Sequence, residues 1–525
     1  MKRRLPLIFK AAAALCSLLL IAANFTYAAP SSSDRHSYLV NLKPGKSVNA
    51  LNAPGIQLKK HWDDLGAANI VADPDTIQKL KNNPDIESIE EDRPVHATAL
   101  GQTYTDGELT WGLQAVHAEQ AWSQNATGSH IRVCVLDSGI DAGHPEFYRN
   151  GTSIIKASQN FVDDGHPDAA DGFGHGTHVS GTIAGQTSAS GSRIGVAPGV
   201  DLYVARVLGD DGNGLTSGVI AGLNWCQENK ANIANLSLGS DEPSHTEQKA
   251  FDRANMNGML IIAASGNDSL NHVGYPAGYK SVVAVGAVDS SLNLASFSDY
   301  GKDQELVGPG VGTLSSVPRG TGLHASAVKD GDSTSYHSNP LEFSGTGSVS
   351  GPLVDCGIAD SAATCGGKPA SGAWIAVIDR GTNAFSEKVQ NAMSQGASAA
   401  VIVNNDTANP DDPGNFTLGA AGSWIPAVSL SYNQGTALRS GGLGTGKVEV
   451  TPWDYSYYEG TSMATPHVTG VAALAWSANP GLTNDQIRKV IESTAVDLGA
   501  PRRDNMFGYG LVQADAAVQM ARSMH

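Results

Sequence analysis

Apolar runs of strand-like composition alternate along this chain with segments of helical composition. The predicted strands cover residues 131–136, 201–208, 232–238, 260–264 and 282–288, and the predicted helices cover residues 216–228, 244–256, 460–478 and 483–494. Strands that alternate with helices form βαβ units, in which neighbouring strands are parallel and lie buried under helices. The sequence therefore predicts an α/β fold with a doubly wound parallel sheet.

Three chemically reactive side chains stand at the ends of these predicted elements. Asp137 directly follows the strand at 131–136, while His175 and Ser462 each open a segment rich in glycine, threonine, valine and alanine. A serine hydroxyl is a weak nucleophile unless a base lies within hydrogen-bond reach, and an imidazole is basic enough near neutral pH to serve. An ionised aspartate would orient that imidazole and stabilise its charged form. Together the three residues predict a nucleophilic catalytic site.

The segments around these residues resemble the signatures of the subtilase family of serine proteases, peptidase family S8. They read Val-Leu-Asp-Ser-Gly around Asp137, Gly-His-Gly-Thr-His around His175 and Gly-Thr-Ser-Met-Ala-Thr-Pro around Ser462, in the family's order. The resemblance runs from about Trp111 to the C-terminus with one interruption. It implies a subtilisin-like endopeptidase that cleaves proteins and peptides through an acyl-enzyme and requires no cofactor for its chemistry.

The resemblance also implies which residues bind the substrate. Asn267, at the end of the apolar run 259–267, would donate its side-chain amide to the oxyanion, with the backbone N–H of Ser462 as the second donor. Further positions carried over from the family line the substrate cleft: Gly212, Gly214 and Leu215 on one edge, Ser237, Leu238 and Gly239 on the other, and Ala264, Gly266 and Gly274 in the specificity pocket. A peptide would pair between the two edges as an added strand. Asp268 at the mouth of the pocket would modestly favour a basic residue before the scissile bond.

The N-terminal segment has the pattern of a secretory signal peptide. Lys2, Arg3 and Arg4 precede an apolar stretch at 11–23, and a small-residue site ends at Ala28. We expect cleavage after Ala28, so residues 1–28 would be removed and the protein would be secreted to the extracellular space. No later run reaches the roughly 18 apolar residues of a membrane span, which predicts no membrane span in the mature form.

Residues 29–100 resemble an inhibitory propeptide of the inhibitor I9 type. Strands are predicted at 38–42, 68–72 and 86–91 and a helix at 74–82, followed by an extended tail at 94–100. The resemblance implies that this tail lies in the active-site cleft and that the enzyme matures by cutting itself near Leu100–Gly101. A permanent N-terminal domain is the alternative.

The catalytic domain is predicted to comprise residues 101–318 and 453–525, with the nucleophilic serine in the second part. The intervening residues 319–452 have their own pattern: strands near 374–381, 399–405 and 425–430, and a helix at 385–396. This insertion resembles a protease-associated (PA) domain. It contains no acid–base pair or metal cluster of its own, so we expect it to restrict or guide the access of substrates.

The cysteines and the acidic residues give weaker indications. Cys356 and Cys365 lie close together in a loop of the insertion and are predicted to form a disulfide. Cys134 and Cys226 could pair or remain free thiols. A structural calcium ion is compatible with the sequence, with Glu146 as a candidate ligand, but the loop at 186–192 lacks carboxylates. The metal ligands therefore stay undetermined.

Charge and composition restrict the alternatives. The formal net charge of −17, without a Lys/Arg-rich patch, argues against a nucleic-acid partner. A selective processing protease would need a strongly acidic cleft, for which Asp210, Asp211 and Asp268 are few. A catalytically silent binding protein would not need an inhibitory propeptide. In an active enzyme, that propeptide would be an intramolecular partner. Three further side chains lie close in sequence to the catalytic candidates: Asp141, His144 and His178. We interpret them as turn or packing residues.

Overall fold

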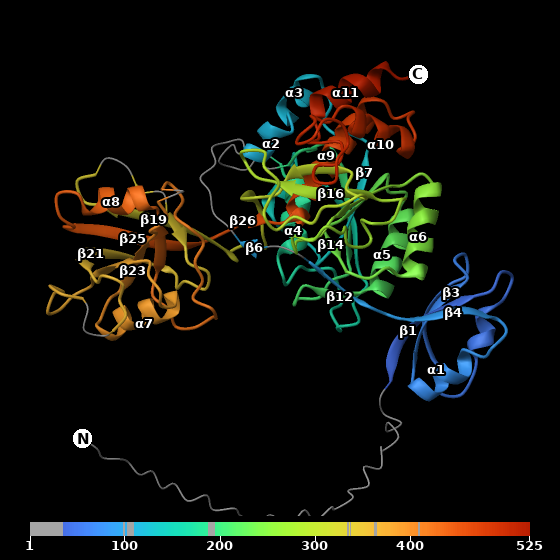
Figure 1. Cartoon of the computed structure of the whole chain (residues 1–525), viewed down its shortest axis with the longest axis horizontal. Coiled ribbons are helices and arrows are strands. Elements are labelled where there is room, and N and C mark those ends of the chain that lie inside the picture. Colours follow the sequence, from blue (N-terminus) through green and yellow to red (C-terminus); the bar gives the residue numbers. More distant parts are fainter. Residues whose placement is uncertain are drawn as a thin grey trace, which may run out of the picture.

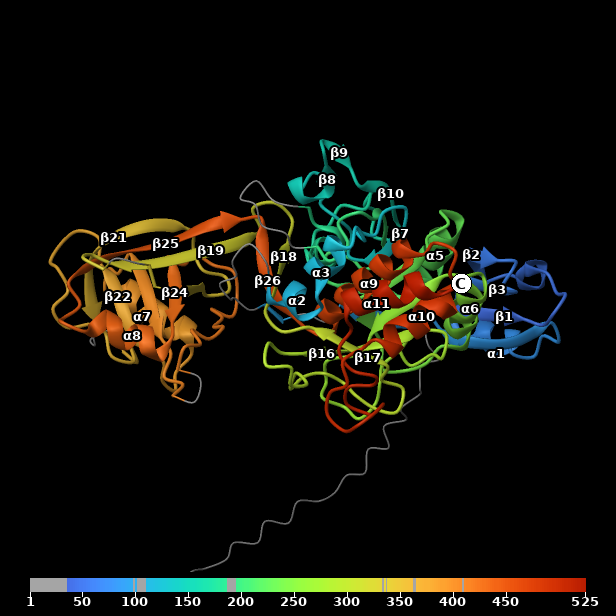
Figure 2. The same cartoon turned by 90° about the horizontal axis from the view of Figure 1, so that it is seen from above.

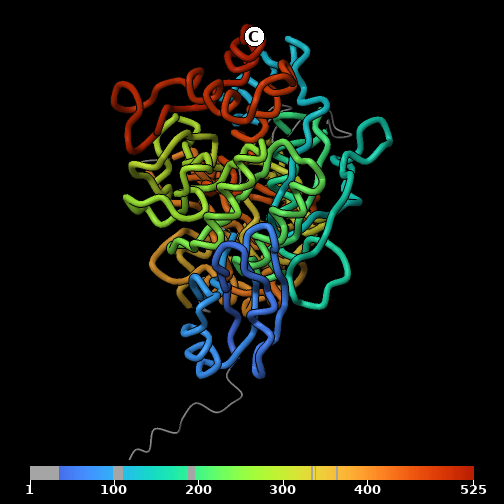
Figure 3. The backbone as a smooth tube through the Cα atoms, turned by 90° about the vertical axis from the view of Figure 1, so that its right-hand side faces the viewer, coloured from blue at the N-terminus to red at the C-terminus, as the bar shows by residue number. Residues whose placement is uncertain are grey.

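The computed structural model describes residues 35–97, 100–101, 110–186, 195–332, 335–336, 338–361, 365–407 and 410–525. The predicted signal peptide lies outside these residues. Figure 1 shows three bodies in a row: a small N-terminal domain in blue, a central α/β body, and an orange domain formed by the insertion. Figure 3, seen from the side of the N-terminal domain, shows that domain in front of the central body.

The central body is built on a seven-stranded sheet in the order β10-β11-β7-β13-β15-β16-β17, and every neighbouring pair is parallel. The strands are β7 (Arg132–Asp137), β10 (Ile155–Asn160), β11 (Asp201–Arg206), β13 (Ile233–Leu236), β15 (Leu260–Ala264), β16 (Val283–Val288) and β17 (Leu306–Pro309). This order confirms the predicted doubly wound sheet. The chain adds β10 and β11 on one side of β7 and the later strands on the other, so the strand order reverses at β7, where open α/β sheets place their sites.

Alternate residues of the strands face two separate cores. Val133 and Val135 lie in one core, which is covered by α4 (His175–Ala184) and α9 (Thr461–Ala478). Cys134 and Leu136 lie in the other core. That second face is covered by α5 (Thr216–Glu228) and α6 (His245–Met256). Because both faces of the central strands are buried, β15 and β16 are apolar throughout, whereas the edge strand β10 is mostly polar and partly exposed.

Further helices pack against the core that contains Val133 and Val135. They are α2 (Trp111–Ala115), α3 (Ala118–Ser123), α10 (Asn484–Ser493) and α11 (Ala514–Ser523). In the part of the chain that the structure describes, no helix has the length and apolar character needed to cross a membrane.

The N-terminal domain contains a four-stranded antiparallel sheet in the order β2-β3-β1-β4. Its elements are β1 (His36–Leu42), β2 (Gln57–Trp62), β3 (Ala67–Ala72), α1 (Pro74–Leu80) and β4 (Ile86–Glu91). Three of the strands and the helix were expected from the sequence. Strand β2 was not, because its side chains are mostly polar and exposed and give no apolar alternation.

The tail that follows this domain lies extended on the central body. Strand β5 (Pro94–Ala97) is the middle strand between β12 (Asn213–Leu215) and β14 (Leu238–Gly239). Strand β6 (Leu100–Gly101) pairs with β26 (Tyr455–Glu459), which also pairs with β18 (Thr313–Ser316). The prediction that the tail is extended is therefore confirmed for both described strands.

The insertion forms a separate domain around a seven-stranded mixed sheet in the order β19-β25-β21-β22-β23-β24-β20. Its elements are β19 (Gly322–Lys329), β20 (Ser338–Pro340), β21 (Gly347–Asp355), β22 (Ile375–Asp379), α7 (Phe385–Ser394), β23 (Ala399–Val403), β24 (Ala427–Leu430), α8 (Tyr432–Arg439) and β25 (Thr445–Trp453). The predicted β22, α7, β23 and β24 are all present. Strands β19 and β25 connect the insertion to the central body.

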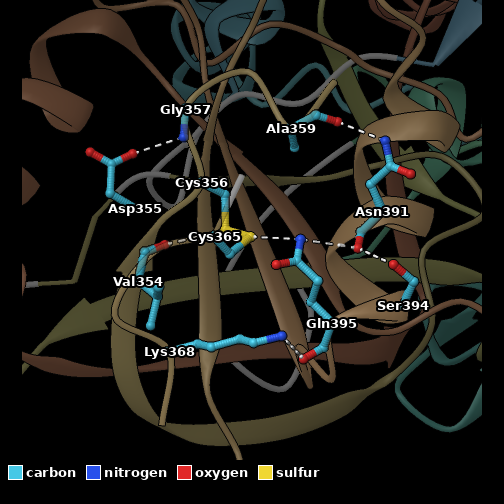
Figure 4. The surroundings of a disulfide bond; sticks show 10 residues. All are labelled: Val354, Asp355, Cys356, Gly357, Ala359, Cys365, Lys368, Asn391, Ser394 and Gln395. Carbon is cyan, nitrogen blue, oxygen red and sulfur yellow. Dashed lines mark hydrogen bonds between the residues drawn. A yellow bond between two sulfur atoms is a disulfide. The ribbon is translucent and has the colours of Figure 1, made fainter. Parts of the chain in front are cut away.

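Two disulfides are present. Cys356 and Cys365 are bonded as predicted, and Figure 4 shows Gln395, at the end of α7, donating to the Cys365 sulfur over 3.3 Å. Cys134 of β7 is bonded to Cys226 of α5, which decides a pairing that the sequence left open. This second bond lies within the core beneath α5 and α6.

Candidate active site

The aspartate and histidine candidates are in direct contact. Asp137 ends β7 at the point where the strand order reverses, and its Oδ1 lies 2.7 Å from Nδ1 of His175. Both side chains are fully buried. Since the Asp137 oxygen also accepts the backbone N–H of Ser138, its orientation is held from two sides. The pair has the geometry by which a carboxylate selects one imidazole tautomer.

A second aspartate, absent from the sequence predictions, holds this pair in place. Asp171 accepts hydrogen bonds from Gly174 N, Thr177 N and the Thr177 hydroxyl at the start of α4, and from the Ser138 hydroxyl beside Asp137. It therefore caps the helix that carries His175 and ties it to the end of β7. The signal in the sequence is an aspartate four residues before His175, just ahead of the predicted helix.

Ser462 lies at the first turn of α9, which packs on α4. Gly460 precedes the helix with φ 147°, a value that favours glycine. The Ser462 hydroxyl donates to the backbone oxygen of Ser237 over 2.9 Å, and the Ser237 hydroxyl donates to the Ser462 oxygen over 2.8 Å. Among the residues that the structure describes, Nε2 of His175 has no hydrogen-bond partner.

Asn267 is oriented by the residue that precedes the serine. Its side-chain oxygen accepts both Thr461 N (2.9 Å) and the Thr461 hydroxyl (2.8 Å). Because the amide oxygen takes these two bonds, the amide nitrogen is the group of Asn267 that can donate to a substrate oxygen. Thr461 is a second positioning residue that sequence reasoning missed; its hydroxyl, next to the serine, was its only signal.

Asp299 supports the loop that carries Asn267. Its Oδ1 accepts Asp268 N (3.0 Å) and Leu270 N (2.7 Å), and its own N–H donates to Gly266 O (2.9 Å). Gly266 has φ 118°, and a Cβ there would lie 2.0 Å from Oδ2 of Asp299. Only glycine therefore fits beside this carboxylate. Asp299 is 4% exposed, and burial raises its pKa to about 6.

The two predicted cleft edges hold the N-terminal tail between them. On one edge Asn213, Gly214 and Leu215 pair antiparallel with residues 96, 95 and 94, and Gly212 O accepts Ala97 N over 3.0 Å. On the other edge Leu238 pairs with Ala97 and Gly239 with His96. The tail is thus a strand added between two edges, as predicted for a bound peptide.

The other predicted pocket residues lie next to these edges. Ala264 ends β15, and Gly266 follows two residues later. Gly274 donates its N–H to Ser265 O, and a Cβ there would meet the backbone oxygens of Ser240 and Ser265, each at 3.3 Å. Gly274 is therefore closely packed between the backbones of Ser240 and Ser265. Asp268 is exposed beside this loop.

Two carboxylates of the N-terminal domain cap helices of the central body. Asp92 accepts the backbone N–H of Ser217 (2.8 Å) and its hydroxyl (2.5 Å) at the start of α5. Glu90 accepts Thr246 N (2.9 Å) and His245 N (3.1 Å) at the start of α6. A negative charge at a helix N-terminus is stabilising, so both contacts strengthen the attachment of this domain.

The remaining candidates near Asp137, His175 and Ser462 make contacts of a structural kind, as interpreted from the sequence. His178 stacks on Tyr458 at 4.4 Å and bonds to Thr313 O, and burial lowers its pKa to about 3, so it stays neutral. His144 donates to Asp454 O over 3.0 Å. Asp141 accepts three hydrogen bonds from Arg319, the first residue of the insertion.

Glu146, the candidate calcium ligand, is buried, and burial raises its pKa to about 7. Its Oε1 accepts the Tyr455 hydroxyl over 2.8 Å, and Oε2 has no hydrogen-bond partner among the described residues. Calcium needs roughly six oxygen ligands or more. Within the described ranges no group of three or more histidine, cysteine, aspartate or glutamate side chains could hold a metal, and residues 187–194 of the adjoining loop lie outside those ranges. The described residues alone do not make a calcium site.

A parallel α/β sheet with an Asp–His pair at its point of strand reversal, and a serine opening an adjacent helix, is the arrangement of an α/β serine protease. The family model for the subtilase family matches residues 128–359 and 435–510, and the model for the PA domain matches residues 349–438. The chain belongs to the subtilase family and carries an inserted PA domain.

Known relatives agree with this assignment. Alkaline elastase YaB of Bacillus sp. (strain YaB) is 31% identical over 464 residues, which are 88% of this chain and 82% of the relative. Subtilisin NAT of Bacillus subtilis subsp. natto is 35% identical over 306 residues, which are 56% of this chain and 76% of the relative. A psychrophilic subtilisin-like protease from the Antarctic psychrotroph Pseudoalteromonas sp. AS-11 has a TM-score of 0.60 at 31% identity, covering 79% of this chain and 99% of its own.

Proposed function

We propose that this subtilase is a secreted endopeptidase made as a self-processing zymogen, in which Asp137, His175 and Ser462 form the catalytic triad. The observation that carries the proposal is a peptide strand, β5, held between β12 and β14, where Ser237, the residue before β14, is hydrogen-bonded to Ser462. The Ser462 hydroxyl would attack the carbonyl carbon while His175 accepts its proton, forming a tetrahedral intermediate.

The developing oxyanion would be bound by the Asn267 amide and the backbone N–H of Ser462. Collapse of the intermediate expels the leaving amine, which takes the proton from His175, and leaves an acyl-enzyme on Ser462. A water molecule, deprotonated by His175, then releases the acid. Loss of one oxyanion donor raises such a barrier by about 3 kcal/mol.

The bond cut during maturation is set by the register of the two tail strands. Ala97 pairs with Leu238, and the neighbour of Leu238, Ser237, is hydrogen-bonded to Ser462. Leu100 pairs with Glu459, which lies on the side where the leaving group of the cleaved bond would be. This register does not favour the expected cut at Leu100–Gly101. We propose instead a cut between Ala97 and Leu100, and the bond after residue 98 is the middle one of the three.

The domain organisation follows from the same proposal. Residues 1–28 would be the signal peptide, 29–98 the inhibitory propeptide, and 319–452 an insertion that guides substrates to a catalytic domain formed by the remaining residues. In the precursor Asp137, His175 and Ser462 are fully buried, which is consistent with inhibition by the attached tail. The mature enzyme would act on proteins and peptides.

The test is expression of the Ser462→Ala precursor beside the wild type in a host without related proteases. We expect wild type to release a mature chain whose N-terminal sequence begins between residues 98 and 100, while the variant stays uncut. A Ser523→Ala protein, altered at an exposed serine at the end of α11, serves as the matched control and should mature normally. Normal processing of the Ser462→Ala protein would refute the proposal.

A further inference from the structure

The insertion is attached by a two-stranded ribbon that leads directly to the nucleophile. Strands β18 and β26 pair next to α4, and the same two chain paths continue as β19 and β25, which pair over eight residue positions. Figure 2 shows this ribbon running from the central body into the insertion domain. Strand β26 ends at Glu459, three residues before Ser462. The insertion and the serine are therefore consecutive parts of one strand-to-helix unit.

The ribbon is fixed to the central body at its base. Arg319 binds Asp141 through its backbone N–H and its guanidinium, and His144 donates to Asp454 O. The Trp453 ring lies 5.2 Å from the Tyr455 ring, at the point where β25 becomes β26. These contacts on both sides of the junction oppose free rotation of the insertion about the ribbon.

The tail strand β6 shows in which direction a chain leaves the cleft. Leu100 pairs with Glu459 and Gly101 with Tyr458, so the chain runs antiparallel to β26. A chain that continues in this direction runs back along β26 toward β25, away from the nucleophile and toward the insertion. Residues on the leaving side of a scissile bond would take the same path.

Strand β21 of the insertion lies on the corresponding side of the ribbon. In the order β18-β26-β6, strand β6 pairs with β26 on the side away from β18. In the order β19-β25-β21, strand β21 pairs with β25 on the side away from β19. Both β6 and β21 run antiparallel to the β25–β26 path. β21 begins with Gly347 opposite Val450, nine residues before Glu459 in the chain. At about 3.3 Å per residue this separation is roughly 30 Å.

We propose that the PA domain binds the part of a polypeptide substrate that lies on the leaving-group side of the scissile bond, with β26 as the guiding edge. The inference rests on the proposed function, because it assumes that substrates follow the tail strands. The occupant is an extended polypeptide whose leaving-group side is at least about ten residues long. Shorter peptides end before the start of β21.

The test uses the mature wild-type enzyme and peptides that share one sequence before the scissile bond. Their leaving-group sides have 4, 8, 12 or 16 residues, numbers chosen as about one half to twice the length of the proposed path. We expect kcat/KM to be similar for the two short peptides and to rise about tenfold between the 8- and 12-residue forms. Equal kcat/KM for all four would overturn the inference while leaving the protease function intact, whereas no cleavage of any peptide would overturn the proposed function.

Two controls separate guidance by β26 from nonspecific effects of length. N-methylation of alternate residues on the leaving-group side should abolish the gain in only one of the two alternating sets, because alternate N–H groups face the partner strand. Trp453→Ala should reduce the gain, whereas Tyr432→Ala, at an exposed aromatic residue of α8 in the same domain, should retain it. A gain that survives both N-methylated sets would exclude β-pairing along β26.

Discussion

Replacement of Asp299 by asparagine should stabilise the protein at alkaline pH, although the residue lies beside the loop that carries Asn267. The carboxylate is 4% exposed, and burial raises its pKa from 3.8 to about 6. A folded-state pKa above the unfolded value means that the folded protein binds the proton more tightly. The resulting stabilisation is complete below pH 3.8 and is lost as the pH rises through 6.

The size of the effect follows from the shift in pKa. About two units correspond to roughly 3 kcal/mol between acidic and alkaline conditions. Asparagine cannot ionise, but its side-chain oxygen can still accept the N–H groups of Asp268 and Leu270. We therefore expect Asp299→Asn to raise the free energy of unfolding at pH 8 by up to about 3 kcal/mol, with little change at pH 4.

The assay is urea unfolding followed by tryptophan fluorescence, in the Ser462→Ala background to prevent self-digestion. Asp303→Asn, which removes an exposed carboxylate in the same loop region, is the matched control and should have little effect at either pH. Equal stability of Asp299→Asn and its parent at pH 8 and pH 4 would refute the reasoning. In the active enzyme, Asp299→Ala should lower kcat about tenfold or more, and asparagine should restore it.

Three further perturbations test other parts of the structure. Asp92→Ala in a propeptide added to mature enzyme should raise its inhibition constant about 10- to 100-fold, because α5 has no side-chain cap of its own; an unchanged constant would contradict the capping role. Gly266→Ala should lower kcat about 100-fold, whereas Gly258→Ala, also at positive φ but with nothing within 4 Å of the added Cβ, should keep activity in the same peptide assay. Removing the Cys134–Cys226 disulfide, with a sequence separation of 92, should lower the free energy of unfolding by about 4.6 kcal/mol, as measured by thermal unfolding. For the Cys356–Cys365 disulfide, with a separation of 9, we expect a loss of about 2.6 kcal/mol, and a larger loss for this bond than for Cys134–Cys226 would contradict the entropic account.

Local sequence was sufficient to predict the central fold and the principal candidate residues. The central strands of the sheet are buried on both faces, so their apolar runs stand out, and glycine-rich turns mark the starts of α4 and α9. Asp137, His175 and Ser462 each occur in a short segment whose neighbours build the strand end or helix start that the side chain needs. The insertion was recognisable because its own apolar runs interrupt the alternation.

Contacts between distant segments could not be predicted in this way. The alternation of Cys134 and Leu136 with Val133 and Val135 predicts two faces of a strand, but not that Cys226 lies opposite Cys134. Asp171, Thr461 and Asp299 are common polar residues in loops or at a helix start, and their roles arise only from the groups that folding brings against them.

The cut site illustrates the same limit. From the sequence, Leu100–Gly101 was a reasonable choice, because an apolar residue followed by glycine suits a deep pocket. The position of a strand in a cleft is determined by backbone pairing with both edges, and a shift of one residue exchanges every side-chain environment. The pairing of Ala97 with Leu238 and of Leu100 with Glu459 exists only in the tertiary structure, and it is the basis of the proposed cut between Ala97 and Leu100. The sequence alone determined the candidate catalytic residues and the class of fold, whereas tertiary structure decided strand register and side-chain partners, because these depend on surfaces that exist only after the segments have packed together.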